Sequence, residues 1–274
     1  MSDKKSAKIR LFVEHVPGQG QTLDLARDQA HYLFGVMRQG VGDFLLIFDG
    51  KSGEWLAQVA QAGKRAGVLT CVEQTKPQMN PPDLWLLFAP IKKARTDFIV
   101  EKAAEMGAAR ICPVATDFTN SERIRQDRLQ AHAVEAAEQC GGTFVPQVTE
   151  LQKLDAVLAN WPPDRQLMFC DEALAGATDT LTQVSARTEG GREAPALGGG
   201  AGAHRAASDP VEELSKQPWA ILIGPEGGFS AAERTRLHAL PFAHAVSLGP
   251  RILRADTAAV AAMTVWQQAL GDWA

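Results

Sequence analysis

Two glycine-bearing loops, each directly after a short apolar segment, constrain this chain more than any other feature. The first, at residues 221–230, reads Ile-Leu-Ile-Gly-Pro-Glu-Gly-Gly-Phe-Ser, and the second, at 247–258, reads Ser-Leu-Gly-Pro-Arg-Ile-Leu-Arg-Ala-Asp-Thr-Ala. The apolar segments are too short for amphipathic helices and suit buried parallel strands, which we predict at 220–223 and 245–248. A strand, a glycine loop and a helix in succession place free backbone N–H groups at the carboxyl edge of a sheet, where open α/β folds bind ligands.

Helix-capping residues follow both loops. Ser230 and Glu233 have capping-box spacing, so a helix should begin there. After the second loop, Asp256 or Thr257 can cap the alanine-rich helix that ends the chain. Both loops are therefore expected to lead directly into helices.

The rest of the chain divides at a polar, proline-rich linker, residues 76–82. Residues 1–75 read as a small β-barrel, with strands at 9–13, 44–48, 55–60 and 68–72 and a helix at 29–38. Residues 83–274 alternate strands (84–89, 110–114, 167–170) with helices (from Thr96 or Asp97 to 106, 127–140, 151–158), which predicts an α/β domain with a largely parallel sheet. A glycine- and alanine-rich stretch, 185–217, reads as a flexible insertion.

Composition narrows the class of protein. The net charge of −4 argues against nucleic-acid binding through a global positive field, although local basic clusters remain at 64–65, 92–95, 123–128 and 251–254. For the first three clusters a solvated face is the favoured alternative. The four cysteines are far apart, which excludes a Cys-x-x-Cys zinc site, and we expect no metal. No segment approaches the roughly 20 apolar residues of a membrane helix, and the first residues lack a secretory pattern, so we expect a cytoplasmic protein.

Known nucleotide loops do not match the first glycine loop. Its spacing differs from Gly-x-Gly-x-x-Gly, and no Gly-Lys-Ser or Gly-Lys-Thr is present. A purely structural turn is the alternative. The second loop, with Arg251 and Arg254, favours a site, because two neighbouring loops at one sheet edge can enclose a ligand.

The two loops together resemble the paired cofactor loops of the SPOUT methyltransferases, and within them the RsmE-type 16S rRNA (uracil-N3)-methyltransferases. Residues 98–107 (Phe-Ile-Val-Glu-Lys-Ala-Ala-Glu-Met-Gly) and 135–141 resemble further segments of that family, and residues 31–38 resemble its PUA-like domain. The chain departs from the family pattern at Gly142-Thr143, where the family often has arginine, and at Asp256, where it often has glutamate.

This resemblance implies a trefoil-knot α/β domain, S-adenosylmethionine as methyl donor, a homodimer, and 16S rRNA as partner, within a small-subunit particle. It implies a set of cofactor-binding residues from both loops and the first strand of the domain: Leu87, Ile223, Gly224, Pro225, Glu226, Gly227, Gly228, Leu248, Gly249, Arg251, Ile252, Leu253 and Thr257. Candidate RNA contacts are Arg38, Lys92, Arg251 and Arg254.

Methylation of uracil N3 requires removal of a proton and stabilisation of the charge that develops on the uracil oxygens. We expect Arg254 to contact the substrate and Asp256 or Glu226 to act as base. Asp256 could instead only cap the last helix. A SPOUT enzyme acting on another RNA site, such as a ribose 2′-OH, and a non-catalytic RNA-binding or assembly factor remain alternatives.

Overall fold

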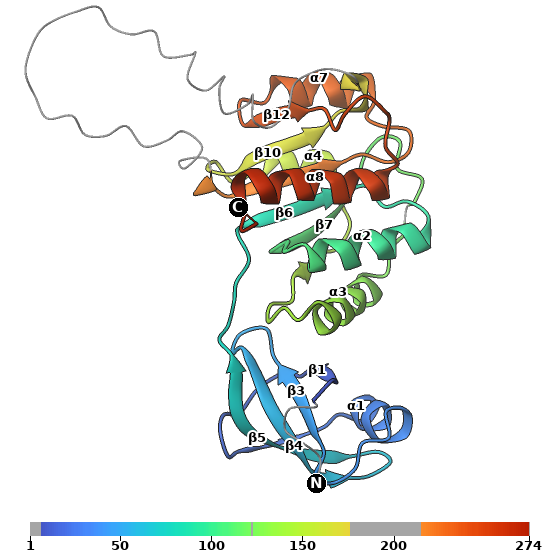
Figure 1. The fold of residues 1–274 in the computed structure, drawn as a ribbon. Helices are drawn as coiled ribbons and strands as arrows, with labels where there is room; N and C mark the ends of the chain where they lie inside the picture. The colour runs from blue at the N-terminus through green and yellow to red at the C-terminus, as the bar shows by residue number, and fades with distance from the viewer. Residues whose placement is uncertain (1–6, 122, 176–214, 274) are drawn as a thin grey trace, which may run out of the picture. The chain divides into compact units, whose positions relative to one another are not determined.

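The computed structural model describes residues 7–121, 123–175 and 215–273, so almost all of the insertion predicted at 185–217 lies outside the described residues. The chain divides into two compact units, residues 1–80 with 134–145, and residues 81–133 with 146–274 (Figure 1).

The N-terminal unit is built on a five-stranded sheet. Its strands are β1 (Arg10–Phe12), β2 (Thr22–Asp24), β3 (Phe44–Phe48), β4 (Glu54–Ala62) and β5 (Gly67–Lys76). They pair in the order β1-β3-β4-β5-β2, with β1 parallel to β3 and the other pairs antiparallel. Alternation along β3 buries Leu45 and Ile47 in one apolar cluster with Leu33 and Leu69. The strand β2 was not predicted, because three residues with one half-buried leucine are too few to establish an alternating pattern.

The helix predicted at 29–38 forms in two parts. α1 (Arg27–Ala30) continues into a π-helix, η2 (His31–Val36), in which the N–H of Met37 donates to the carbonyl of Tyr32 at 2.9 Å. The helical segment therefore ends at Val36, two residues before the predicted end at 38. Arg38, directly after the wide turn, has φ +56°, an uncommon conformation for a residue with a Cβ.

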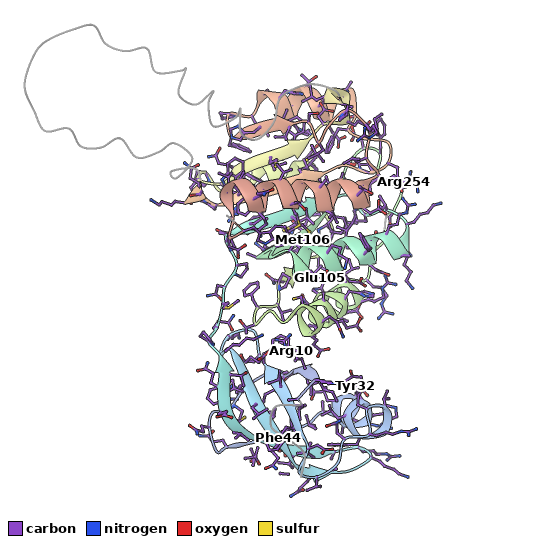
Figure 2. All side chains as sticks on the ribbon, viewed as in Figure 1. Arg10, Tyr32, Phe44, Glu105, Met106 and Arg254 are labelled. Carbon is purple, nitrogen blue, oxygen red and sulfur yellow. The ribbon has the colours of Figure 1, made fainter. Side chains whose placement is uncertain are left out.

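Arg10 ties the end of helix α3 (Gln126–Cys140) to this unit (Figure 2). Its guanidinium donates to the carbonyls of Ala137, Glu138 and Gly142 at 2.5, 3.0 and 2.8 Å and pairs with Glu54 at 2.7 Å. The departure from the family pattern at 142–143 thus has a structural role here, since the Thr143 hydroxyl also accepts the Met79 N–H at 2.8 Å.

The second unit is an α/β domain around a parallel sheet. Six strands follow the order β12-β10-β11-β6-β7-β8, and β9 pairs with β7. Their bounds are β6 (Leu84–Phe88), β7 (Arg110–Ala115), β8 (Gln147–Val148), β9 (Gln152–Lys153), β10 (Gln166–Cys170), β11 (Trp219–Ile223) and β12 (Ala243–Val246). All pairs are parallel, as predicted. The chain therefore brings every strand's carboxyl end to one edge.

Helices cover both faces of this sheet. One face packs against α2 (Lys93–Glu105), α3 and α8 (Ala255–Leu270), whose Val100, Leu129 and Trp266 join one buried cluster with strand residues. The other packs against α4 (Leu154–Ala159) and α7 (Ala231–Ala239), whose Leu154 and Leu237 join a second cluster. Successive residues of β11 point into alternate clusters, which explains why this strand reads as continuously apolar.

Three predicted boundaries were wrong. α2 begins at Lys93 rather than Thr96, because the Thr96 hydroxyl bonds both backbone groups of Ile91 at 3.0 Å from within the first turn. The helix predicted at 151–158 starts only at Leu154, since Gln152–Lys153 pair with β7. The strand predicted at 245–248 lies at Ala243–Val246, where pairing with β10 sets its register.

Candidate active site

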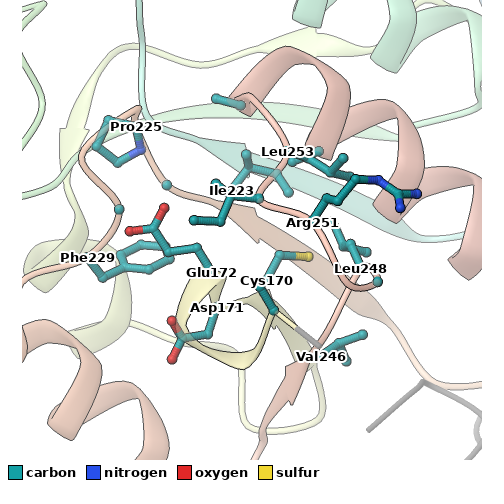
Figure 3. Close-up of a pocket in the computed structure, with 17 residues that line it drawn as sticks. Cys170, Asp171, Glu172, Ile223, Pro225, Phe229, Val246, Leu248, Arg251 and Leu253 are labelled. Carbon is teal, nitrogen blue, oxygen red and sulfur yellow. The ribbon is translucent and has the colours of Figure 1, made fainter. Parts of the chain in front are cut away.

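A pocket opens at the carboxyl ends of three neighbouring strands, β10, β11 and β12 (Figure 3). It encloses about 550 Å³, counting the part open to solvent, which is within the range of small-molecule sites. Three strand ends, the loops after them and the start of α8 line it: Cys170, Asp171, Glu172 and Ala175; Ile223, Gly224, Pro225, Gly228 and Phe229; Val246, Leu248, Gly249, Arg251, Ile252 and Leu253; Ala255 and Ala258. The two glycine loops therefore line one cavity, as expected for two loops at the same sheet edge.

The loop after β11 owes its shape to its glycines. Gly228 has φ +66°, and its N–H donates to the carbonyl of Pro225 at 2.9 Å, which closes a tight turn. A Cβ on Gly224 would lie 3.2 Å from the Phe229 ring. The chain then enters α7 through the predicted capping box: Ser230 accepts the Glu233 N–H at 3.2 Å, and Glu233 accepts the Ser230 N–H at 2.9 Å.

The loop after β12 ends in a helix that lacks the predicted cap. α8 begins at Ala255 with Arg254 as N-cap residue, and no side chain caps it. Asp256 instead lies in the first turn, where it accepts the Thr257 N–H at 2.9 Å and faces Arg95 at 3.7 Å. A carboxylate in a first helical turn still interacts favourably with the helix dipole, so Asp256 and Thr257 belong to the helix start without being its cap.

The segment after β10 was not predicted to contribute. Asp171 is 3% exposed and is held by Arg234 at 2.9 Å and His238 at 3.4 Å. Glu172 instead directs its carboxylate at the first glycine loop: a Cβ added to Gly228 would lie 2.1 Å from Glu172 Oε1. The sequence signal that could have indicated this contribution is the pair of acidic residues directly after the strand predicted at 167–170. The sequence did not reveal that β10 lies between β11 and β12.

Cys170 also faces the pocket, but its thiol is poorly suited to act as a nucleophile. Burial raises its pKa to about 12, so the thiol stays protonated at neutral pH. The sulfur therefore acts as part of the apolar wall.

The predicted site residues divide into those that line this pocket and those that do not. Nine predicted cofactor residues line it: Ile223, Gly224, Pro225, Gly228, Leu248, Gly249, Arg251, Ile252 and Leu253. Four do not: Leu87, fully buried in the apolar core, Glu226 and Gly227, exposed at the loop tip, and Thr257 in α8.

The predicted RNA contacts are all exposed. Arg254 lies at the start of α8, beside the second loop (Figure 2). Lys92 is the N-cap residue of α2, and Arg38 belongs to the N-terminal unit. Arg251 is the one that also lines the pocket.

The described residues contain neither a cluster suited to a metal ion nor a membrane-spanning helix. No group of three or more histidine, cysteine or carboxylate side chains is placed to hold a metal ion. No helix in that part of the chain has the length and hydropathy needed to cross a membrane.

Comparison with known proteins identifies the family. A model of the RNA methyltransferase domain matches residues 78–267, and a model of the RNA methyltransferase PUA domain matches residues 25–70. Ribosomal RNA small subunit methyltransferase E from Rickettsia conorii is 26% identical over 255 residues, 93% of each chain. The protein of that name from Synechocystis is 28% identical over 88% of this chain and 71% of its own.

Two solved structures have the same fold. Ribosomal RNA small subunit methyltransferase E from Neisseria gonorrhoeae, bound to S-adenosyl methionine, superposes with a TM-score of 0.77 at 23% identity, covering 97% of this chain and 99% of its own. A putative methyltransferase from Legionella pneumophila, in complex with the same cofactor, also gives 0.77 at 26% identity, covering 96% and 98%. The SPOUT-type α/β domain preceded by a PUA-like domain is thereby confirmed, while the trefoil knot stays a prediction. The protein belongs to the RNA methyltransferase family of the ribosomal RNA small subunit methyltransferase E type.

Proposed function

We propose that this protein transfers a methyl group from S-adenosylmethionine to N3 of a uridine in 16S ribosomal RNA. The observation that carries the proposal is the single pocket shared by the glycine loops after β11 and β12. The names of the relatives support small-subunit rRNA as substrate, and the cofactor in two similar structures supports the methyl donor.

The pocket suits a nucleoside that carries a charged amino-acid tail. Ile223, Leu248 and Leu253 supply apolar walls for a base. Within the described part of the chain, the backbone groups of residues 251–253 have no hydrogen-bond partner, so they are available to the polar edge of that base. Glu172 and Arg251 place one carboxylate and one guanidinium where an ammonium and a carboxylate of the tail can pair with them. The residues present therefore fit the cofactor.

The predicted cofactor residues fall into two groups by their position relative to the pocket. The nine that line the pocket would contact the cofactor directly. Leu87, Glu226, Gly227 and Thr257 would act from behind or beside it, Leu87 through packing under the loops.

When bound, the cofactor supplies a methyl group that is electrophilic because it is attached to a sulfonium. The protein's own task is to align the uracil and to manage its charge. We assign Arg254 to the developing charge on the uracil oxygens, because it is exposed beside the second loop and forms no ion pair among the described residues. Asp256 or Glu226 would take the N3 proton. Asp256 faces Arg95, whereas Glu226 is exposed at the tip of the first loop.

The RNA would also contact cationic groups outside the pocket. Lys92, at the start of α2, and Arg251 would meet phosphates near the target base. Arg38 would meet RNA from the PUA-like unit, and its φ of +56° supports a binding role, because strained backbone conformations concentrate at functional sites. The target base must be unpaired or flipped out of its stack to enter the pocket.

We further propose a homodimer that acts in the cytoplasm on a small-subunit particle. Ile252, which lines the pocket, is 71% exposed, and Val265 on α8 is 39% exposed; a second copy would cover both apolar groups. Sedimentation velocity of the full chain tests this: a monomer across micromolar concentrations would rule out the dimer.

Replacement of Arg254 tests the catalytic assignment. Arg254→Ala should leave cofactor affinity within about twofold, measured by calorimetry, and reduce tritium transfer to 16S rRNA by about 100-fold or more, as loss of one transition-state donor does. Arg236→Ala, which removes an arginine on α7 that pairs with Asp155, is the matched control and should retain activity. Normal turnover in Arg254→Ala would refute the role, and mass spectrometry of the methylated RNA would reveal a product other than N3-methyluridine.

A further inference from the structure

A second pocket lies in the same unit, between the starts of helices α2 and α3. It encloses about 740 Å³, counting the part open to solvent. Its lining includes four cations, Lys93, Arg123, Arg125 and Arg128, together with Ser121. These cations come from the basic clusters at 92–95 and 123–128, which are far apart in the sequence. From the sequence alone, each cluster was interpreted as a separate solvated face, whereas the fold brings the two together in one pocket.

The charge in this pocket is only partly neutralised. Arg128 pairs with Asp97, and Arg125 pairs with Asp127 at 2.5 Å. Within the described residues, Lys93 and Arg123 form no ion pair, both are exposed, and no carboxylate lines the pocket. The pocket is therefore locally positive in a chain whose net charge is −4, which favours an anionic ligand there.

The second pocket lies at the same edge of the sheet as the first. Ile91 follows β6 and Ser121 follows β7, so both belong to the carboxyl edge of the parallel sheet. The Arg95–Asp256 pair, at 3.7 Å, joins the start of α2 to the start of α8. The starts of α2 and α8, which carry Lys93 and Arg254, are therefore linked at this edge.

We propose that this pocket binds backbone phosphates of the RNA substrate next to the nucleotide that enters the methylation site. This inference rests on the proposed function and extends it to residues 93, 121, 123, 125 and 128. Guanidinium groups form forked hydrogen bonds to phosphate, and the lysine and the serine hydroxyl add point contacts. α2 begins without a side-chain cap, and within the described residues the N–H groups of Lys93 and Ala94 have no hydrogen-bond partner, so they can also meet this anion. Ile124 gives one wall an apolar surface on which a ribose or base can lie.

A charge-matched pair of double variants tests the proposal. Lys93→Gln with Arg123→Gln removes the two unpaired cations. Lys102→Gln with Arg236→Gln removes the same charge from α2 and α7 without touching the pocket lining. Fluorescence anisotropy would measure binding of a 16S rRNA transcript to the full chain over a range of salt concentrations, and calorimetry with S-adenosylmethionine would verify that each variant folds.

The expected result is a selective loss of RNA affinity. For single-stranded RNA, each lost phosphate contact lowers the slope of log K against log salt concentration by roughly 0.7. Loss of two contacts therefore weakens binding by a factor of about 10 to the power 1.4, or about 25-fold, at about 0.1 M salt. RNA affinity should change much less in the control double variant, and cofactor affinity should be unchanged in both. The charge-conserving variant Lys93→Arg with Arg123→Lys should retain RNA binding. KM for RNA should rise in the pocket variant with kcat nearly unchanged.

Equal losses in the two double variants would overturn the proposal, because the effect would then come from overall charge. Unchanged RNA affinity of the pocket variant would also overturn the proposal, and an acidic protein segment would then be the better candidate ligand of the pocket. Failure of the proposed function looks different: the unmodified protein would bind the transcript but transfer no methyl group to it.

Discussion

The contact between Gly228 and Glu172 allows a quantitative test of the pocket geometry. Gly228 has φ +66°, and a Cβ there would lie 2.1 Å from Glu172 Oε1, whereas ordinary contacts begin near 3.4 Å. In Gly228→Ala the carboxylate must retreat by more than about 1 Å, which requires a different or distorted rotamer. The substitution thus combines backbone strain with a side-chain displacement.

The two costs can be separated with a double-mutant cycle. A left-handed conformation costs alanine about 1–2 kcal/mol, and the rotamer change about 0.5–1.5 kcal/mol, so Gly228→Ala should lower the free energy of unfolding by about 2–3 kcal/mol. In a Glu172→Ala background only the strain remains, which leaves a coupling energy of about 1 kcal/mol between the sites. Gly249→Ala, in the same unit, with φ +114° and no atom within 4 Å of the added Cβ, is the control for strain alone.

Urea unfolding followed by tryptophan fluorescence is the assay. Five of the six tryptophans, at 85, 161, 219, 266 and 273, belong to the second unit, so the signal reports mainly on the unit that holds the pocket. Calorimetry should also show weaker cofactor binding in Gly228→Ala, because the displaced carboxylate no longer faces the tail. If Gly228→Ala costs the same free energy in both backgrounds, Glu172 does not lie against this loop and the pocket has a different shape.

Two further predictions concern stability. Arg10→Lys should destabilise the N-terminal unit by about 3 kcal/mol, because an ammonium cannot replace a guanidinium that reaches three carbonyls and Glu54; hydrogen exchange of β1 and β3 amides measures this, and unchanged protection would contradict it. Burial lowers the pKa of His244, so the folded protein binds this proton less readily than the unfolded chain and stability should fall as the pH drops through about 6.5. His244→Gln should flatten that dependence between about pH 5 and 8, and identical pH profiles in urea titrations would show that His244 does not cause it.

Local sequence patterns correctly predicted those features of the fold that are determined by residues close together in the chain. The strand at 220–223 and the Ser230–Glu233 capping box form as expected, because apolar continuity and capping are set within a few residues. The cap of α8 was predicted wrongly: Asp256 and Thr257 are good capping residues, but the strand before them ends two residues earlier than expected.

What escaped prediction depends on strand order. Asp171 and Glu172 follow a strand that was predicted, yet their place in the pocket comes from β10 pairing with both β11 and β12. The same holds for Lys93 and Arg123, which the β6–β7 pairing brings to one pocket. Pairing between segments far apart in the chain leaves no local mark on either segment, so neither grouping could be read from one sequence.

Contacts at the amino ends of the parallel strands fix the positions of the pocket loops at their carboxyl ends. Arg165, just before β10, donates to both carboxylate oxygens of Asp83, before β6, at 2.9 and 2.8 Å. It also donates to the carbonyl of Trp219, the first residue of β11, at 2.8 Å, and its guanidinium lies 3.7 Å from the centre of the Trp85 ring. One side chain thus fixes the starts of three strands. Since strand rise is nearly constant, a fixed register at the amino edge sets where each loop begins at the carboxyl edge. The residues that hold the pocket together therefore lie a strand's length from those that line it, and an exposed group such as Arg254 can vary without loss of the fold.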